Sequence, residues 1–289
     1  MTRPYRSALY IPGSRVRALD KARGLPVDVI LFDLEDAVTP DEKVTARATL
    51  ADELGKGGYG SRMRVVRMNG LDSAWGAADA VAIDAMACDA VLVPKVNSAA
   101  DVDAVAALTE KPLWAMMETP LGVLNALKIA AHPRIEGFVL GTNDLAKDLG
   151  VRHRADRMTL MTSLQICLLA ARAHGVVAID GVYNAFKDDA GFAIECEQGR
   201  DLGFDGKSLI HPAQIAAANV AFAPTAAEID LANRQIAAFA AAQANGQGVA
   251  VVDGKIVENL HIVTARATLA KAKAKAKAKA TAIAKADAQ

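Results

Sequence analysis

Eight short apolar runs recur along the chain, and each is followed within a few residues by charged or polar side chains that could take part in catalysis or binding. Continuous apolar runs of this length are typical of strands that are buried on both faces, as in a parallel sheet. A helix-like stretch follows every run, so the pattern consists of β-then-α units. We expect the strands to be Ser7–Ile11, Val29–Phe32, Met63–Val66, Ala90–Val93, Leu113–Met117, Gly137–Leu140, Val176–Ile179 and Ser208–Ile210.

Eight such units in about 210 residues predict an α/β fold, the (β/α)8 TIM barrel. The carboxyl ends of the strands form the active face of such barrels, and here they carry acids, arginine and amides. Glycines stand where helices are expected to end, at Gly24, Gly150, Gly175 and Gly203. The predicted helices include Arg17–Arg23, Pro40–Leu54, Ala99–Leu108 with Ser98 as N-cap, Leu121–Ala131, Arg157–His174 with Asp156 as N-cap, and Lys187–Leu202.

The C-terminal part of the chain predicts an extension of the barrel. Two further helices, Ala213–Ala221 and Ala226–Ala244, precede a hairpin over 249–257 that turns at an Asp-Gly pair. A last helix, Ala265–Ala270, runs into alternating Ala and Lys, which forms no apolar stripe and predicts a solvated, fraying helix. We therefore expect a barrel over 1–222, a helix and lid segment over 223–268, and a low-complexity tail over 269–289.

Composition narrows the class of protein. The 289 residues are 52% apolar but only 4% aromatic, so aliphatic side chains must fill the core. The net charge of zero hides a tail of +5 on a body of −5, which does not favour nucleic-acid binding by the body. The lack of a long apolar run and of a signal-like N-terminus predicts a cytoplasmic protein without membrane contact. Cys88, Cys167 and Cys196 lack metal-binding spacing and are expected to be reduced thiols.

Two acids at strand ends are the leading candidates for a metal site. Glu118 follows the fifth predicted strand and Asp144 follows the sixth. The ends of adjacent barrel strands lie about 5 Å apart, so both carboxylates can reach one point above the barrel. Two carboxylates that close need a shared proton or a cation, and Mg²⁺ accepts one or two carboxylates together with waters and substrate oxygens. In the alternative interpretation each acid only stabilises the start of the following helix.

Other strand ends add acids and cations. Asp33, Glu35 and Asp36 are predicted to hold metal-bound waters and to orient neighbouring groups, or else to stabilise a helix N-terminus. Arg67 suits two-pronged binding of a substrate carboxylate or of a developing enolate oxygen, and a salt bridge to Glu35 or Asp36 is the alternative. Lys95 is expected to be a charged neighbour of the acids, with a Schiff base there, or at Lys207, as the lesser possibility.

The remaining motifs exclude several classes of enzyme. His211 closes the eighth run and is expected to face substrate, although a His-Pro pair is also common in capping turns. The sequence contains no dinucleotide-binding glycine motif after a strand, no Walker A loop and no Gly-x-Ser-x-Gly elbow. Nicotinamide chemistry, nucleotide hydrolysis and serine-hydrolase chemistry therefore lack their usual motifs.

On these residues the chain resembles the citrate lyase β-subunit-like family of the HpcH/HpaI aldolase/citrate lyase superfamily, which includes malyl-CoA lyases and malyl-CoA thioesterases. The likeness spans Tyr5 to about Glu258. The matching motifs are Tyr10–Arg15, Asp33–Val38, Arg67–Gly70, Pro94–Val96, Met117–Pro120, Gly141–Leu145, Asp180–Val182 and Ile210–Pro212.

The resemblance implies a site and a cofactor. It implies Mg²⁺, with Mn²⁺ as a substitute, held by Glu118 and Asp144, and a substrate carboxylate or carbonyl on Arg67. Homotrimers or homohexamers are expected, with a C-terminal segment of a neighbouring subunit closing the site. In that segment this chain has Glu258 where many relatives have aspartate. The residues expected to bind the CoA thioester and its acyl group are Tyr10, Arg15, Lys21, Arg67, Glu118, Asn143, Ile210 and His211.

The resemblance also implies a reaction. The sequence around Asp180–Asn184 and Val257–His261 resembles the thioesterase branch more than the lyases. We therefore expect Mg²⁺-dependent hydrolysis of (3S)-malyl-CoA to malate and CoA, with Arg67, Glu258, Glu35 and Asp36 as catalytic residues. Cleavage of malyl-CoA or β-methylmalyl-CoA to glyoxylate and acyl-CoA, or a citrate lyase β-like cleavage, is the alternative. A barrel that binds CoA esters without turning them over is the non-enzyme alternative.

Overall fold

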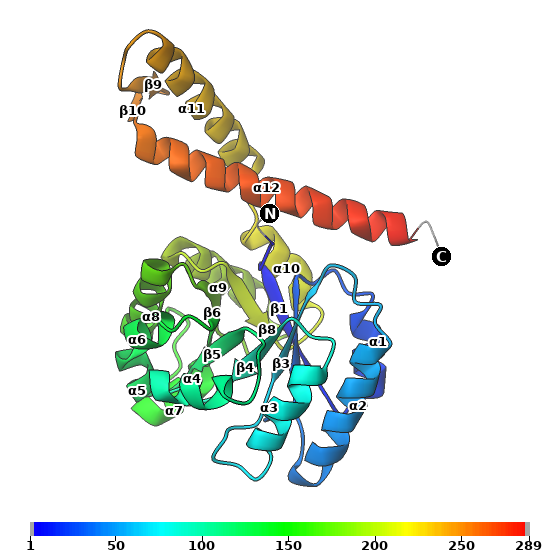
Figure 1. Cartoon of the computed structure of the whole chain (residues 1–289). Coiled ribbons are helices and arrows are strands. Elements are labelled where there is room, and N and C mark those ends of the chain that lie inside the picture. Colours follow the sequence, from blue (N-terminus) through cyan, green and yellow to red (C-terminus); the bar gives the residue numbers. More distant parts are fainter. Residues whose placement is uncertain (1–2, 287–289) are drawn as a thin grey trace. The chain divides into compact units, whose positions relative to one another are not determined.

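The structure is a computed structural model that describes the backbone of residues 3–286 and the side chains of residues 3–273. The chain divides into two compact units, 5–222 and the C-terminal residues 223–289 together with residues 1–4. The first unit is a closed barrel of eight parallel strands in sequence order, with helices around it (Figure 1). This confirms the predicted α/β barrel.

The eight barrel strands coincide closely with the predicted apolar runs. β1 pairs with β2 on one side and with β8 on the other, which closes the cylinder. The largest differences are at β6 and β8, each of which begins two residues earlier than predicted. The strands are β1 Ser7–Pro12, β2 Val29–Asp33, β3 Met63–Arg67, β4 Ala90–Val93, β5 Leu113–Met117, β6 Ile135–Leu140, β7 Val177–Asp180 and β8 Gly206–Leu209.

Helices alternate with the strands and cover the outside of the barrel. Gly150, Gly175 and Gly203 end α7, α8 and α9 with φ of 66°, 71° and 106°, a left-handed conformation that glycine adopts without strain. The helices are α1 Val16–Ala22, α2 Lys43–Gly55 after a 3-10 turn at Pro40–Glu42, α3 Gly76–Ala85, α4 Ala99–Ala106, α5 Pro120–Leu124, α6 Ala126–Ala130, α7 Thr142–Leu149, α8 Met161–His174, α9 Asp189–Leu202 and α10 Gln214–Ala221.

Two helix predictions were wrong. The stretch 121–131 is not one helix, because the backbone leaves the helical region at Asn125 and two short helices form instead. Asp156 does not cap a helix that starts at Arg157, because Arg157 is left-handed with φ of 52° and α8 begins four residues later. Asp156 instead pairs with Arg154. By contrast, Ser98 caps α4 through a capping box with Asp101, as predicted.

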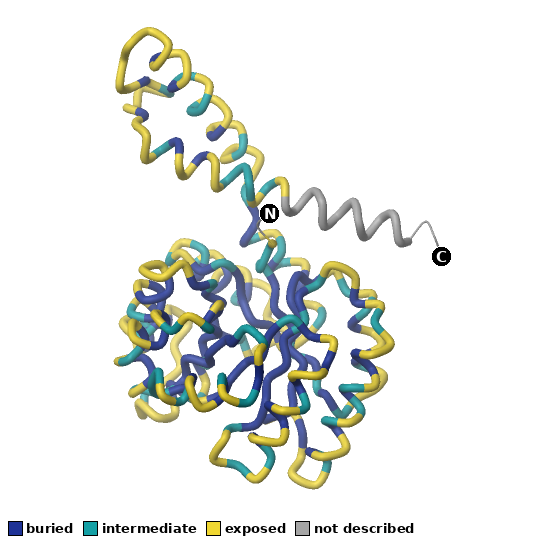
Figure 2. Tube along the Cα trace, in the orientation of Figure 1, coloured by how far each residue is buried: buried dark blue, intermediate teal, exposed yellow. Residues whose placement is uncertain are grey.

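Alternate residues of most strands pack in two different cores, one inside the barrel and one between the strands and the helices. Figure 2 shows that the barrel strands are largely buried. Val29 and Leu31 belong to the cluster inside the barrel, whereas Ile30 and Phe32 pack against the helices. The same alternation places Trp114 and Met116 inside on β5. Because the side-chain period of a strand is two, the residue that ends each strand inherits one of these two directions.

The C-terminal unit has a small core of its own. It contains α11 Ala226–Ala244, the antiparallel pair β9 Ala250–Val252 and β10 Lys255–Val257, and α12 Asn259–Ala286. Phe239, Val257 and Ile262 are among its buried residues. Asp253 and Gly254 have φ of 49° and 73°, as expected of a tight two-residue hairpin turn. The last helix starts six residues earlier than predicted.

The alternating Ala-Lys segment continues α12 as far as Ala286, and residues 287–289 lie outside the described part of the chain. Among the helices in residues 3–286, none combines the length and apolarity that a membrane crossing requires.

Candidate active site

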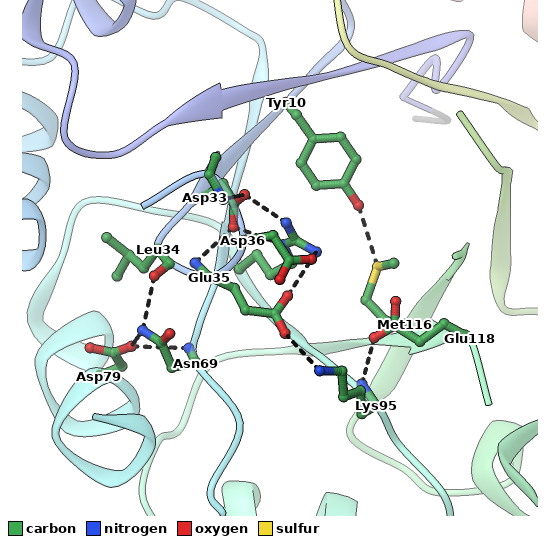
Figure 3. Close-up of polar contacts among 12 residues, drawn as sticks. Tyr10, Asp33, Leu34, Glu35, Asp36, Asn69, Asp79, Lys95, Met116 and Glu118 are labelled. Atoms are coloured by element: carbon green, nitrogen blue, oxygen red, sulfur yellow. Dashed lines mark hydrogen bonds and ion pairs between the residues drawn. The ribbon is translucent and has the colours of Figure 1, made fainter. Parts of the chain in front are cut away.

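Four polar side chains follow the inward-facing rows of the barrel strands and meet at one end. Tyr10 continues the row of Ala8 on β1, Asp33 continues Val29 and Leu31 on β2, and Arg67 ends β3. Glu118 follows Trp114 and Met116 after β5. Figure 3 shows Tyr10, Asp33 and Glu118 around this mouth of the barrel.

Arg67 is held by Asp33 through two parallel hydrogen bonds. Its Nε donates to Asp33 Oδ1 at 2.8 Å and its Nη2 donates to Asp33 Oδ2 at 2.6 Å. Both side chains are buried, and the guanidinium lies 5.0 Å from the centre of the Tyr10 ring. The predicted alternative of a salt bridge to Glu35 or Asp36 was therefore incomplete, because Asp33 is the principal partner.

The third nitrogen of Arg67 faces the other acids of the turn. Nη1 lies 2.7 Å from Glu35 Oε2 and 3.5 Å from Asp36 Oδ2. Asp33 also accepts hydrogen bonds from the backbone N–H groups of Glu35 and Ala37. Asp33 is thus fully engaged in orienting Arg67 and the turn, while Glu35 and Asp36 present carboxylates toward the mouth.

Glu35 has an unusual electrostatic environment. Burial raises the pKa of its carboxyl to about 7, against the opposing effect of Arg67 and with a further upward contribution from Asp36. Its other oxygen lies 3.8 Å from Lys95 Nζ. A carboxyl group with a pKa near neutrality can both accept and release a proton at physiological pH.

Glu118 is as deeply buried as Asp33, with 1% of its surface exposed. Its Oε1 accepts the backbone N–H of Lys95 at 2.8 Å, and Lys95 adopts a left-handed backbone with φ of 51°. Burial raises the pKa of Glu118 to about 7, the Lys95 N–H and Arg67 oppose that rise, and the charge of Asp144 adds to it. A cation between the two acids would relieve both the burial and the repulsion.

The loop after β6 brings Asp144 to this side of Glu118. Gly141 lies so close that a Cβ there would stand 2.4 Å from Glu118 Oε2, which only glycine avoids. Asp144 lies in the first turn of α7 and is partly exposed. The two acids therefore fit Mg²⁺ in donor chemistry. In residues 3–273 no three His, Cys, Asp or Glu side chains form a metal cluster, so waters and substrate would supply the other oxygens.

Asn143 lies beside Asp144 and pairs with the side-chain amide of Asn184, which was not among the predicted site residues. Asn143 Nδ2 donates to Asn184 Oδ1 at 3.2 Å, and Asn184 Nδ2 donates back to Asn143 Oδ1 at 2.7 Å. The pair links the loop after β6 to the loop after β7. Asn184 lay in a motif of the predicted family, but no local pattern indicated its partner.

The residues expected to bind CoA lie on β1, at both ends of α1 and on the turn after β8. Arg15 and Lys21 are exposed at the start of α1 and in its last turn. Ile210 is also exposed, and the His211 ring stacks on Phe186 with centroids 4.8 Å apart. Tyr10 is set deeper, where its hydroxyl donates to Met116 Sδ at 3.3 Å.

Glu258 belongs to the C-terminal unit. It directly precedes α12, is exposed, and its backbone N–H donates to His261 Nδ1 at 3.0 Å.

Lys207 and Asp180 point to the outer layer of the barrel instead of its mouth. Lys207 is fully buried, and its Nζ donates to Asp180 Oδ2 at 3.0 Å, to Glu195 Oε1 at 2.7 Å and to the Gly181 carbonyl at 2.6 Å. Arg157 Nη1 also donates to Asp180, at 2.7 Å. An ammonium with these partners is a structural cation, which weakens the Schiff-base alternative at Lys207.

Residues 6–212 match the HpcH/HpaI aldolase/citrate lyase family. The chain belongs to the HpcH/HpaI aldolase/citrate lyase family. Within it, the chain is 65% identical to a (3S)-malyl-CoA thioesterase of Cereibacter sphaeroides (strain ATCC 17029 / ATH 2.4.9), over 93% of this chain and 94% of the relative. It is 36% identical to the citrate lyase β subunit of Escherichia coli K12, again over 93% and 94%.

Solved structures of the HpcH/HpaI family resemble the chain as well. The protein CitE from Mycobacterium tuberculosis, in complex with magnesium, acetoacetate and coenzyme A, superimposes with a TM-score of 0.78 at 30% identity, over 92% of this chain and 97% of that one. The citrate lyase β subunit from the same organism, with oxaloacetate and magnesium, gives 0.69 at 33% identity, over 76% and 98%.

Proposed function

We propose that this protein is a Mg²⁺-dependent thioesterase that hydrolyses (3S)-malyl-CoA to malate and CoA. The observation that carries the proposal is the 65% identity to a (3S)-malyl-CoA thioesterase across 93% of the chain. The mouth of the barrel supports it. Glu118 and Asp144 provide carboxylates for a metal ion, and Arg67 provides a positive charge for a carboxylate of the substrate.

Glu118 and Asp144 would hold the metal ion. Their carboxylates suit Mg²⁺, and Mn²⁺ as a substitute, because both are hard cations that prefer oxygen donors. When bound, the ion supplies a positive charge that polarises a carbonyl or hydroxyl oxygen of the substrate. The magnesium in the related CitE structure supports magnesium as the bound ion.

Arg67 would bind the carboxylate or carbonyl of the malyl group. Asp33 fixes the plane of the guanidinium through Nε and Nη2, so that Nη1 keeps a constant direction toward Glu35 and Asp36. Because Asp33 takes the paired Nε and Nη2 donors, the substrate would meet Nη1 rather than the two-donor edge of the guanidinium.

Hydrolysis of a thioester adds water across the carbon–sulfur bond. The acyl carbon receives hydroxide from a water that has given up a proton, and the departing sulfur receives a proton to become the CoA thiol. Glu35 can carry such a proton because burial brings its pKa to about 7. Asp36 would orient water beside it, and Glu258 is the proposed general base, contributed by the lid segment of a neighbouring subunit.

The CoA part of the substrate would lie along Tyr10, Arg15 and Lys21, and along the turn at Ile210 and His211. Asn143 would contact the acyl group beside Asp144. The coenzyme A bound to the related CitE protein supports a CoA thioester as the substrate class. We further propose a cytoplasmic homotrimer or homohexamer, with a barrel over 1–222, a lid segment over 223–268 and a lysine-rich tail over 269–289.

Carbon–carbon cleavage is the second candidate function. It is favoured by the 36% identity to the citrate lyase β subunit of Escherichia coli K12 over 93% of this chain. In this case malyl-CoA or β-methylmalyl-CoA would yield glyoxylate and an acyl-CoA, with a base acting on the 3-hydroxyl.

One product assay separates these functions. Purified protein is incubated with (3S)-malyl-CoA and Mg²⁺, and free thiol and glyoxylate are measured separately. Thiol without glyoxylate supports hydrolysis, and glyoxylate with acetyl-CoA indicates the lyase. Release of neither product, with malyl-CoA still binding, would overturn the proposal in favour of a barrel that only binds CoA esters.

A further inference from the structure

Two side chains outside the acidic turn hold its backbone in place. The carbonyl of Leu34 accepts hydrogen bonds from Asn69 Nδ2 and from Lys43 Nζ, each at 2.9 Å. Lys43 Nζ also donates to the carbonyl of Glu35 at 2.6 Å. We propose that Asn69 and Lys43 are positioning residues, which act through the Leu34–Glu35 backbone to hold the Glu35 carboxylate against Arg67.

Asn69 is itself fixed by an acid on a neighbouring helix. Asp79 on α3 has no exposed surface, and its Oδ2 accepts the backbone N–H of Asn69 at 3.0 Å and Asn69 Nδ2 at 2.6 Å. Its Oδ1 accepts from Arg47 Nε on α2. Figure 3 shows the chain of contacts from Asp79 through Asn69 to Leu34. The amide of Asn69 therefore has one orientation, and its hydrogen bond to the Leu34 carbonyl holds the turn in place.

Lys43 is a buried lysine whose ammonium donates hydrogen bonds to the carbonyls of this turn. It is the first residue of α2, is 6% exposed, and lies 5.7 Å from the centre of the Trp75 ring. Burying an ammonium is unfavourable unless it is hydrogen bonded. Here the two carbonyls that accept from Lys43 belong to the peptide groups on either side of the Glu35 α-carbon. Such a placement couples the start of α2 to the geometry of the site.

The benefit of this support is positional. Glu35 Oε2 lies 2.7 Å from Arg67 Nη1 but has no hydrogen bond of good geometry, so its place depends on the backbone that carries it. A displacement of about 1 Å in a catalytic group can lower the rate about 100-fold. This inference rests on the proposed function, since it assumes that Glu35 and Arg67 act on the substrate.

Two variants test the inference by different physical routes. Lys43→Met removes both carbonyl contacts and one charge, whereas Asn69→Ala removes a contact to the same turn without changing charge. We expect kcat to fall about 10- to 100-fold in both, with KM within about twofold of wild type. Crystal structures of both should show Glu35 displaced from Arg67. Lys43→Arg, which keeps donors at this position, should recover part of kcat.

The matched control is Lys111→Met, because Lys111 Nζ also donates to a backbone carbonyl, that of Cys88, at 3.2 Å. It should keep wild-type kcat. The inference is overturned if Glu35 stays in contact with Arg67 in both variants, if Asn69→Ala keeps full kcat, or if Lys111→Met loses as much. Asn69→Ser and Lys43→Gln replace any variant that does not fold. If wild-type protein releases no thiol, the proposed function fails, while the position of Glu35 in the crystal structures still tests this inference.

Discussion

Asp33 and Arg67 are register partners on adjacent strands, and their side chains form a two-pronged ion pair at the mouth of the barrel. Since both face inward, the pair fixes the plane of the guanidinium and directs Nη1 toward Glu35. This arrangement depends on β2 and β3 being in the observed register. It makes Arg67 a rigid donor instead of a flexible surface cation.

Arg67→Lys should lower kcat/KM by at least about 100-fold, because a single ammonium cannot bond both oxygens of Asp33 and also reach the substrate. Steady-state kinetics with malyl-CoA measure the effect. The control is Arg64→Lys on the same strand, which loses a similar pair with Asp89 that lies at the other end of β3. Equal losses in the two variants would contradict a special role for Arg67.

Glu118→Gln should change how the stability of the metal-free protein depends on pH. Burial raises the pKa of Glu118 to about 7, while a glutamate in the unfolded chain has a pKa of about 4.3. Between these values the folded protein binds more protons than the unfolded chain, so its stability falls as pH rises and levels off above about 7. The glutamine variant loses this part of the slope.

The expected result is a variant with a higher Tm than wild type at pH 8 in EDTA, and with nearly the same Tm at pH 4.5. Adding Mg²⁺ at pH 8 should raise the Tm of wild type but not that of the variant. Thermal unfolding followed by circular dichroism provides both measurements. A wild-type Tm that does not respond to Mg²⁺ would argue against Glu118 as a metal ligand.

Removal of the metal should abolish turnover. EDTA should stop release of the CoA thiol, and Mg²⁺ or Mn²⁺ should restore it. Asp144→Asn should raise the Mg²⁺ concentration needed for half-maximal activity by more than about tenfold, since an amide is a weaker ligand than a carboxylate. Asp148→Asn, one turn further along α7 on an exposed residue, serves as the control. Activity in EDTA with borohydride trapping at Lys95 would instead indicate a Schiff base.

Glu258→Gln should reduce kcat strongly without reducing stability. The residue is exposed and precedes α12, so its side chain contributes little to the core of Phe239, Val257 and Ile262. We expect a loss of about 100-fold in kcat, typical of removing a general base, with Tm unchanged. Glu197→Gln, at an exposed position on α9, should have no effect on either quantity. A Glu258→Gln variant with wild-type kcat would remove Glu258 from the mechanism.

Asp180→Asn tests the buried network on the outer layer of the barrel. It leaves Lys207 and Arg157 facing a neutral amide, and breaking a buried pair in this way costs about 3–5 kcal/mol in the free energy of unfolding. Urea denaturation measures the loss, and Asp201→Asn on the exposed part of α9 is the control. The expected distinction from Arg67 is that the folded fraction of Asp180→Asn keeps a nearly normal kcat.

The sequence by itself determined the strands, their order and the class of fold. Short apolar runs and the glycines at Gly150, Gly175 and Gly203 are local signals, and local signals fix where elements begin and end. It also placed Glu118 and Arg67 at strand ends, and its motifs indicated the family. These features depend on residues near one another in the chain.

Only the tertiary structure decided which acid pairs with which cation. The sequence predicted Glu35 or Asp36 as a partner for Arg67, whereas the register of β2 with β3 makes Asp33 its principal partner. Likewise, Asp180 ends β7 as Asp33 ends β2, yet it faces Lys207 in the outer layer. The physical reason is that side chains alternate between two faces, and a shift of one residue changes which face a carboxylate occupies.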